Sequence, residues 1–279
     1  MEKSKKTSII IVNYNSRPYL EICLQSLLAN TLSPYEILII DNHSKDDSAL
    51  FLEKIKDPRI RVYINNSNVG YSKACNQGLV EATGDYFVTM NPDVVVPEGW
   101  LTRLLYHLEV NPRTLIVGPK SLEFGGSRWT GPLSFSSRLP AADRKFARLY
   151  HRMSEPAKFL SGCLLLFDRR LLRCVGFFDE NLILGGDDFD LSLRVRRDGY
   201  ELRIAKDLLI RHVIHGSFRN SDPQENERLA TASWKYFYRK WERELKEYGW
   251  KRLFEDEFPV FPGEETFRVL PVFPGGVKR

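Results

Sequence analysis

The chain has 279 residues, 43% of them hydrophobic, and a formal net charge of +5. It is long enough to bury a substantial core, as one large domain or as one domain with an appendage. The modest basic excess suits an anionic ligand or an anionic membrane surface, but it is too dispersed to indicate nucleic-acid binding. Four scattered cysteines, without a CxxC pair or zinc-type spacing, predict reduced thiols. Neither a signal-type apolar segment nor a run of roughly 20 apolar residues is found. We therefore expect a cytoplasmic protein, free or peripheral at the inner face of the plasma membrane.

The amino-terminal part of the chain alternates buried strands with amphipathic helices. Strands are predicted from short apolar, β-branched runs, and helices from apolar residues at helical spacing. Such alternation is typical of βαβ units in a mostly parallel sheet. The predicted strands are 8–12, 36–41, 59–65, 86–90 and 115–118, and the predicted helices are 19–30, 49–56, 72–82 and 100–110.

The rest of the chain is less regular. Residues 123–152 are rich first in Gly, Ser and Pro and then in Lys and Arg, which indicates a long insertion or mobile loop, either around an acceptor or simply solvated. Beyond it we predict a strand at 159–167, a short helix at 168–175, strands at 201–204 and 208–212, and an extended tail at 258–279.

Polar residues gather where the predicted strands end. Asn13, Asp41, residues 65–70 and residues 91–93 all fall at strand carboxyl ends, on the edge where open α/β sheets bind their ligands. Asp93 follows a core strand on an Asn-Pro-Asp corner with a stiff backbone, so its carboxylate is well placed to bind a hard cation on a diphosphate. An aspartate that caps an ordinary turn is the alternative, and the convergence of the other strand ends argues against it.

The segment from Asn68 to Gly78 enters a helix, with Gly70 at the turn and Lys73 in the first helical turn. A helix amino terminus beside a cation can bind an anion, although a glycine turn before a capped helix explains the pattern equally well. The pattern matches neither a Walker loop nor a GxGxxG fingerprint, which weakens ATP-dependent and nicotinamide-dependent functions.

Three aspartates crowd the start of a predicted helix after Gly185-Gly186, namely Asp187, Asp188 and Asp190. Capping, and an i,i+4 pair between Asp190 and Arg194, account for part of this pattern. Three acids within four residues nevertheless repel one another more than capping requires. A carboxylate presented at this helix start is therefore a credible general base.

Two features near the carboxyl end have two interpretations each. His212 or His215 could ligate a metal, although a lone loop histidine usually does not. The long amphipathic helix predicted at 231–248 carries an aromatic stripe flanked by Lys and Arg. Such a stripe can lie on a membrane surface, but contact with the domain itself is the more frequent cause.

Taken together, these stretches resemble the GT-A-fold, family 2 inverting glycosyltransferases over roughly residues 7–240. The order and spacing of the motifs are far more specific than any single one. The resemblance implies an α/β fold of the GT-A (Rossmann-like) type. Its mostly parallel, mixed sheet is flanked by helices, and a C-terminal amphipathic helix and an extended tail follow. It also implies a catalytic domain at 1–225, with a nucleotide-sugar-binding half at 1–118 and an acceptor half at 119–225, and a helical appendage with a Pro/Gly-rich tail at 226–279.

Carried over position by position, the family's motifs fall on particular residues of this chain. Asp188 matches the general base, Asp93 and His212 match the metal ligands, and Asp41 matches the acid that binds the pyrimidine edge. The nucleotide-sugar site implied in this way consists of Val12, Asn13, Tyr14, Asp41, Asn68, Gly70, Lys73, Asn76, Asn91 and Asp93. The acceptor side and its supporting residues are Gly162, Asp187, Asp190, Arg194 and Trp129.

Two positions depart from the family pattern. Asn91 replaces the first acid of the metal motif, which removes one negative charge near the cation. Asp187 replaces the usual glutamate, which shortens that side chain by one methylene. The Asn-Pro-Asp sequence is similar to the branch that includes bacterial rhamnosyltransferases, so dTDP-L-rhamnose is the preferred donor.

The resemblance implies an enzyme that moves a sugar from a nucleoside-diphosphate sugar to a hydroxyl of a cell-surface glycan or lipid-linked acceptor. Mg²⁺ or Mn²⁺ would bind the diphosphate, and Asp188 would act as the base. A sugar-1-phosphate nucleotidyltransferase stays an alternative, although residues 13–18 lack the Gly-rich basic loop it needs. A non-catalytic sugar-nucleotide or glycan-binding module is the second alternative. We expect no nucleic-acid partner, and the sequence does not indicate an oligomeric state.

Overall fold

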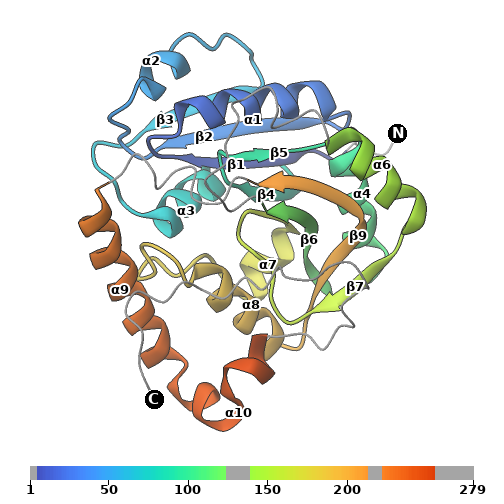
Figure 1. Cartoon of the computed structure of the whole chain (residues 1–279), viewed down its shortest axis with the longest axis vertical. Coiled ribbons are helices and arrows are strands. Elements are labelled where there is room, and N and C mark those ends of the chain that lie inside the picture. Colours follow the sequence, from blue (N-terminus) through green and yellow to red (C-terminus); the bar gives the residue numbers. More distant parts are fainter. Residues whose placement is uncertain (1–4, 124–138, 213–221, 255–279) are drawn as a thin grey trace.

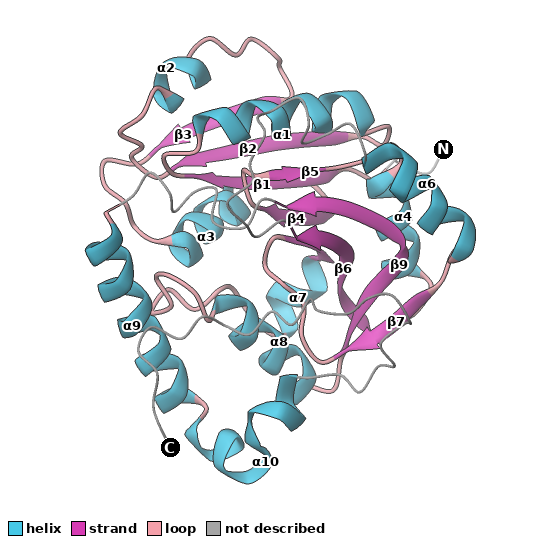
Figure 2. Cartoon of the chain, in the orientation of Figure 1, coloured by secondary structure: helices cyan, strands magenta, loops and turns pink. Residues whose placement is uncertain are grey.

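The computed structural model describes residues 5–123, 139–212 and 222–254, and in them a single mixed β-sheet has helices on both faces (Figure 1; Figure 2). The nine strands of this part of the chain follow the order β3-β2-β1-β4-β8-β6-β9-β5, with β7 paired to β9. The strands are β1 Thr7–Asn13, β2 Tyr35–Asp41, β3 Ile60–Ile64, β4 Tyr86–Met90, β5 Val94–Val95, β6 Thr114–Glu123, β7 Ser154–Ala157, β8 Leu164–Asp168 and β9 Glu201–His212. The helices are α1 Arg17–Asn30, α2 Ser48–Leu52, α3 Tyr71–Glu81, α4 Trp100–Glu109, α6 Leu139–Leu149, α7 Arg169–Cys174, α8 Asp187–Arg197, α9 Pro223–Lys240 and α10 Glu242–Phe254.

Strand β1 lies between β2 and β4 and is buried on both faces. Ile9 and Ile11 belong to the core under α1 and α4, whereas Ile10 and Val12 belong to the core under α3 and α8. Because successive residues of a strand point to opposite faces, a strand covered on both sides needs a continuous apolar run. This explains the unbroken β-branched sequence at the start of the chain.

The first four strands are parallel and bring their polar ends together. β1 pairs with β2 and β4, β2 pairs with β3, and the register places Asn13 opposite Asp41. The chain then passes from β4 through Asn91 into β5, whose Val94 pairs with His212 at the end of the antiparallel β9. The carboxyl-terminal edge of the sheet therefore receives residues from both halves of the chain.

The second half of the sheet is mixed. β8 is antiparallel to β4 and β6, and β9 is parallel to β6 but antiparallel to β5 and β7. The predicted strand–turn–strand at 201–212 is wrong, because β9 is continuous and residues 206–208 form an irregularity where the register against β6 shifts. The strand predicted at 159–167 begins only at Leu164, and β7 was not predicted.

Helix α6 corrects the prediction of a loop through residue 152. Leu139, Ala142 and Phe146 recur at helical spacing and contact a small core of α1, β5 and β9. Asp143 is buried on the same helix and pairs with Arg103 at 2.9 Å. Arg144, Lys145 and Arg148, which suggested a loop, occupy the exposed face of this helix. Residues 124–138 lie outside the described part of the chain.

The long helix predicted at 231–248 is two helices, α9 and α10, which meet at Trp241. Phe237 and Trp241 of the aromatic stripe are buried in a core shared with α8, so contact with the domain accounts for most of the stripe. Tyr238 and Tyr248 remain exposed. No helix among the described residues is long and apolar enough to cross a membrane. The extended tail predicted at 258–279 lies outside the described residues.

Candidate active site

Asp93 and His212 meet beside Asn91 at the carboxyl-terminal edge of the sheet. Oδ1 of Asp93 lies 3.3 Å from Nε2 of His212, and Nδ2 of Asn91 lies 3.2 Å from the same nitrogen. Asp93 is 3% exposed, and its Oδ1 accepts no hydrogen bond from the described residues. The pairing of Val94 with His212 holds the backbone of His212 beside this corner.

The geometry of this pair fits a divalent cation. Two ligand atoms that each lie about 2.1 Å from one octahedral ion are about 3 Å apart, close to the 3.3 Å between Asp93 and His212. A buried carboxylate oxygen without a donor is unfavourable unless a cation completes it. Within the described residues no group of three or more His, Cys, Asp or Glu side chains could hold a metal. An ion at Asp93 and His212 would therefore take its other ligands from substrate or water.

A cavity of about 300 Å³ adjoins this pair and lies between the two halves of the chain. The strand ends and the start of α3 form one wall, and the loop before α8 and its first turn form the other. Asn226 and Leu229 of α9 also reach it. The remaining lining residues are Val12, Tyr14, Asn42, Asn68, Gly70, Tyr71, Asn91, Pro92, Ser161, Gly162, Cys163, Ile183, Leu184, Gly185, Asp187 and Asp188.

The polar residues at the ends of β1 and β2 bind one another, although Oδ1 of Asn13 accepts no hydrogen bond from the described residues. Nδ2 of Asn13 donates to Oδ2 of Asp41 at 2.7 Å, and Ser44 donates to Asp41 from its backbone N–H and its hydroxyl. Asn13 and Asp41 are fully buried and do not line the cavity. Asn42, which follows Asp41, does line it and donates from Nδ2 to Oδ1 of Asn68 at 2.7 Å. The base-binding role of Asp41 stays a prediction.

Lys73 and Asn76 lie outside the cavity wall. Lys73 is exposed and lines a separate hollow with Glu180. The amide of Asn76 donates to the carbonyl of Phe178 and accepts from its backbone N–H, both at 3.0 Å. Because an α-helix turns 100° per residue, the face of α3 that presents Tyr71 to the cavity directs Lys73 elsewhere.

Asp188 lies in the cavity wall in the first turn of α8. Its Oδ2 accepts a hydrogen bond from the backbone N–H of Gly162 at 3.0 Å, and its Oδ1 accepts one from Phe189 at 2.9 Å. Burial raises the pKa of Asp188 to about 6, because the charged form loses its hydration. A carboxylate with this pKa is ionised at neutral pH and is a stronger base than an exposed aspartate.

Asp187 lines the cavity beside Asp188 and is mostly buried. Burial, followed by the charge of Asp188, raises the pKa of Asp187 well above its usual range. Two such neighbours resist carrying two negative charges, and the N–H groups of Gly162 and Phe189 favour the charge on Asp188. Gly162 permits the close approach that positions Asp188, since a Cβ at residue 162 would lie 3.3 Å from the Cβ of Asp188.

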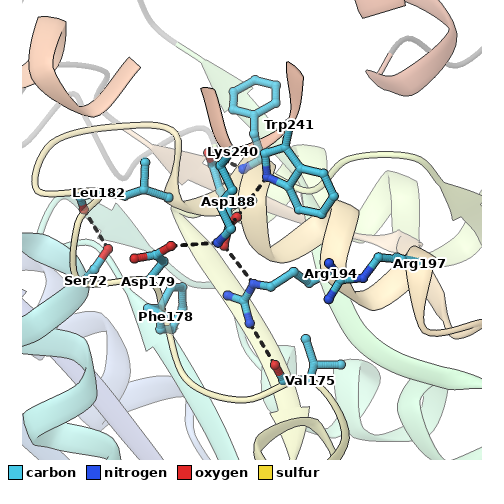
Figure 3. Close-up of polar contacts among 12 residues, drawn as sticks. Ser72, Val175, Phe178, Asp179, Leu182, Asp188, Arg194, Arg197, Lys240 and Trp241 are labelled. Atoms are coloured by element: carbon cyan, nitrogen blue, oxygen red, sulfur yellow. Dashed lines mark hydrogen bonds and ion pairs between the residues drawn. The ribbon is translucent and has the colours of Figure 1, made fainter. Parts of the chain in front are cut away.

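Asp190 and Arg194 lie behind the cavity wall. Asp190 is fully buried; its Oδ2 accepts from Nε of Arg194 at 2.7 Å, and its Oδ1 accepts from Nε1 of Trp241 at 2.9 Å. Figure 3 shows Arg194, Lys240 and Trp241 converging from α8 and from the junction of α9 and α10. These contacts anchor the start of α8. Trp129, predicted on the acceptor side, lies outside the described residues.

The contribution of α9 to the cavity was missed from the sequence. Asn226 and Leu229 stand three residues apart on one helical face and are half-buried, while Glu227 and Arg228 between them are exposed. The signal was the Asp222-Pro223 pair, a capping residue before a proline at the first helical position. This pair places the helix start at Pro223, eight residues before the start predicted at residue 231.

Comparisons with known sequences agree with this architecture. The family model described as Glycosyl transferase family 2 matches residues 8–176. An uncharacterized glycosyltransferase of Haemophilus influenzae is 30% identical over 120 residues, and the match covers 42% of this chain and 37% of that protein. The N-acetylglucosaminyl-diphospho-decaprenol L-rhamnosyltransferase of Mycobacterium tuberculosis is 25% identical over 239 residues, covering 76% of this chain and 78% of that protein. The chain thus spans little more than a third of the first relative and most of the second.

The fold is also similar to solved glycosyltransferase structures. A crystal structure of GalNAc-T7 with UDP, GalNAc and Mn²⁺ has a TM-score of 0.68 at 21% sequence identity, covering 89% of this chain and 51% of that one. This likeness confirms the predicted GT-A fold. The family model matches more than half of the residues of this chain. The chain therefore belongs to glycosyl transferase family 2.

Proposed function

We propose that this protein is an inverting glycosyltransferase that moves a sugar from a nucleoside-diphosphate sugar to an acceptor hydroxyl. One observation carries the proposal. Asp188, whose pKa burial raises to about 6, lies in the wall of a cavity whose opposite wall is formed by strand ends. Burying a carboxylate in this way lowers the stability of the fold at neutral pH. A module that only binds sugar nucleotides gains nothing from that cost, whereas a general base does.

The reaction proposed is a single in-line displacement. The acceptor oxygen attacks the anomeric carbon opposite the diphosphate, and Asp188 takes the hydroxyl proton. The bond from the anomeric carbon to the diphosphate oxygen breaks, and that oxygen keeps the electron pair. The backbone N–H groups of Gly162 and Phe189 hold the carboxylate of Asp188 in place. One displacement inverts the anomeric centre.

Asp93 and His212 are proposed to hold a divalent cation, either Mg²⁺ or Mn²⁺. When bound, such an ion offsets the charge of the leaving nucleoside diphosphate. The support for this assignment is the 3.3 Å separation of the two side chains, together with the Mn²⁺ in the GalNAc-T7 structure. Asn91 stands where an acid would add a further negative charge, so this chain should bind the ion more weakly than a site with two acids.

We also propose the identity of the donor sugar and the class of the acceptor. dTDP-L-rhamnose remains the preferred donor, supported by the Asn-Pro-Asp corner and by the rhamnosyltransferase relative. A cell-surface glycan or lipid-linked acceptor is supported by the same relative, whose name contains a decaprenol-linked sugar. Any peripheral contact of residues 231–248 with the inner membrane face would use Tyr238 and Tyr248, because Phe237 and Trp241 are buried.

The test is release of nucleoside diphosphate by purified protein from a panel of dTDP, UDP and GDP sugars. Each donor is assayed with Mn²⁺, with Mg²⁺ and with chelator, in the presence of a polyprenyl-diphosphate sugar as acceptor. Cation-dependent release from one donor is expected. Pyrophosphate exchange with a sugar 1-phosphate would instead identify a nucleotidyltransferase. Calorimetric donor binding without turnover under all these conditions would identify a binding module.

A further inference from the structure

The segment that leads into α8 has little regular structure of its own. Gly185 and Gly186 both adopt positive φ angles, +81° and +84°, so the backbone turns here where other residues would be strained. The segment is instead held from two sides. The hydroxyl of Ser72 in α3 donates to the carbonyl of Leu182 at 2.8 Å, and the backbone N–H of Leu184 donates to the hydroxyl of Ser233 in α9 at 2.9 Å. The start of α8 is therefore positioned by α3 and α9.

A second attachment lies one turn into α8, at Asp190. Nζ of Lys240 lies 2.6 Å from Oδ1 of Asp190 and 2.6 Å from Oδ2 of Asp179, so this cation joins α8 to the preceding loop. Nε1 of Trp241 donates to the same oxygen of Asp190. Figure 3 shows the side chains of Lys240 and Trp241 close together. Lys240 ends α9 and Trp241 follows it, so both come from outside the segment that carries the base.

The same contacts set the charge around the cavity acids. After burial and the charge of Asp188, the charge of Asp190 is a further cause that raises the pKa of Asp187. Arg194 and Lys240 lie against Asp190 and offset its charge. From α3, Tyr71 and Cys75 face the acids; burial raises the pKa of both, so neither is charged near pH 7. Cys163, before β8, faces the same cavity.

We propose that Lys240 and Trp241 are positioning residues for transfer. By binding Asp190 they fix the first turn of α8, and Lys240 offsets a negative charge that would otherwise act on Asp187 and, through the Asp187–Asp188 pair, on Asp188. The proposal rests on Asp188 being the base, and it makes the α9–α10 junction part of the reacting site. Neither Lys240 nor Trp241 lines the cavity, so both act on the site through the carboxylate of Asp190.

The test compares pH profiles of kcat/KM for four proteins besides the wild type. Lys240→Met removes the charge, Trp241→Phe removes only the Nε1–H donor, and Lys240→Arg keeps a cation. Lys246→Met, which breaks an exposed pair with Glu242 on α10, is the matched control. In Lys240→Met we expect the midpoint of the acid limb of the kcat/KM profile to shift to higher pH by roughly 0.5–1 pH unit. Trp241→Phe should move it less in the same direction, and the other two should leave it unchanged.

A purely structural role makes a different prediction. It would lower kcat/KM by the same factor at every pH and leave the acid limb in place, and that result would overturn the proposal. If Lys240→Met does not fold, as judged by circular dichroism, Trp241→Phe alone carries the test, because the phenyl ring can occupy most of the indole site. An unchanged limb in Trp241→Phe would then count against the proposal.

A measurement without substrate separates this proposal from the catalytic one. In protein labelled with ¹³C at the aspartate carboxyls, the Asp188 resonance is identified by its loss in Asp188→Asn. Its titration midpoint should rise in Lys240→Met and stay unchanged in Lys246→Met. An unchanged midpoint in Lys240→Met overturns the positioning proposal. A midpoint that rises while the kcat/KM limb does not follow upholds the positioning effect and refutes Asp188 as the base.

Discussion

The two halves of the molecule build their walls of the cavity in different ways. In residues 7–95 the wall follows from parallel strands that end in register, with Asn13 opposite Asp41 and the chain turning at Asn91. In residues 154–254 the wall is a glycine-rich segment and the first turn of α8, held by side chains of α3, of α9 and of the α9–α10 junction. Local periodicity determines the first wall, and long-range contacts determine the second. Substitutions should therefore affect binding in the first half and chemistry in the second.

The largest effect is expected at Asp188. Asp188→Asn removes the proton acceptor and should lower kcat/KM by about 10³-fold or more, while the donor affinity measured by calorimetry changes little. Asp198→Asn, an exposed acid just after the same helix, is the control and should retain activity. Equal losses of turnover and donor affinity in Asp188→Asn would contradict this division of labour.

The next effect tests the first wall. Asp93→Asn should raise the Mn²⁺ concentration needed for half-maximal turnover by roughly 10–100-fold, because it removes the carboxylate that lies 3.3 Å from His212. Asn91→Asp adds a negative charge at the same corner and should tighten the apparent Mn²⁺ affinity. Titrations of activity with Mn²⁺ measure both. If neither substitution shifts the midpoint, the cation is not bound at this edge of the sheet.

A smaller effect concerns stability and its dependence on pH. The pKa of Asp188 is raised to about 6, above the value near 3.9 of an unfolded aspartate, so the folded state holds this proton more tightly. The charged carboxylate therefore lowers stability as pH rises from about 4 to above 6. Between pH 4 and pH 8 the free energy of unfolding of Asp188→Asn should rise by roughly 2 kcal/mol relative to that of the wild type. Urea unfolding with chelator present measures it, and a pH-independent difference would contradict the assigned pKa.

The smallest effect is expected at Lys73. The side chain is exposed and lies in a hollow separate from the cavity, so Lys73→Ala should change kcat/KM by less than about threefold. A tenfold or larger loss in kinetic assays would mean that this lysine reaches the diphosphate in the working enzyme. In that case the nucleotide-sugar-binding role implied by the family resemblance would be correct for Lys73, although its side chain lies outside the cavity here.

Much of the first wall could be predicted from the sequence, because strand ends are marked by apolar runs that stop at polar residues. The parallel register then followed from the alternation of strands and helices, and Asp93 and Asp41 fell on the expected edge. The orientation of side chains within a helix was harder to predict than the positions of the strand ends. Lys73 and Asn76 lie on the correct helix, but the helical turn of 100° per residue places them outside the cavity.

The second wall was predicted only in part. Three acids after two glycines indicated a general base at this helix start, since that clustering exceeds what helix capping explains, and the resemblance to family 2 glycosyltransferases implied Asp188 in particular. Its supports could not be predicted, because Lys240 and Trp241 bind Asp190 across some fifty residues of sequence. Helix α6 was missed for a similar reason: its apolar face is short and becomes recognisable only where α1, β5 and β9 cover it.

The most direct test of the account is the anomeric configuration of the transferred sugar. The product made with the active donor is analysed by NMR, using the one-bond coupling between C1 and H1. A single displacement with Asp188 as the base predicts a product of opposite configuration to the donor. Retained configuration would contradict it, because retention requires two displacements or front-face attack, and neither uses a base in the position that Asp188 occupies.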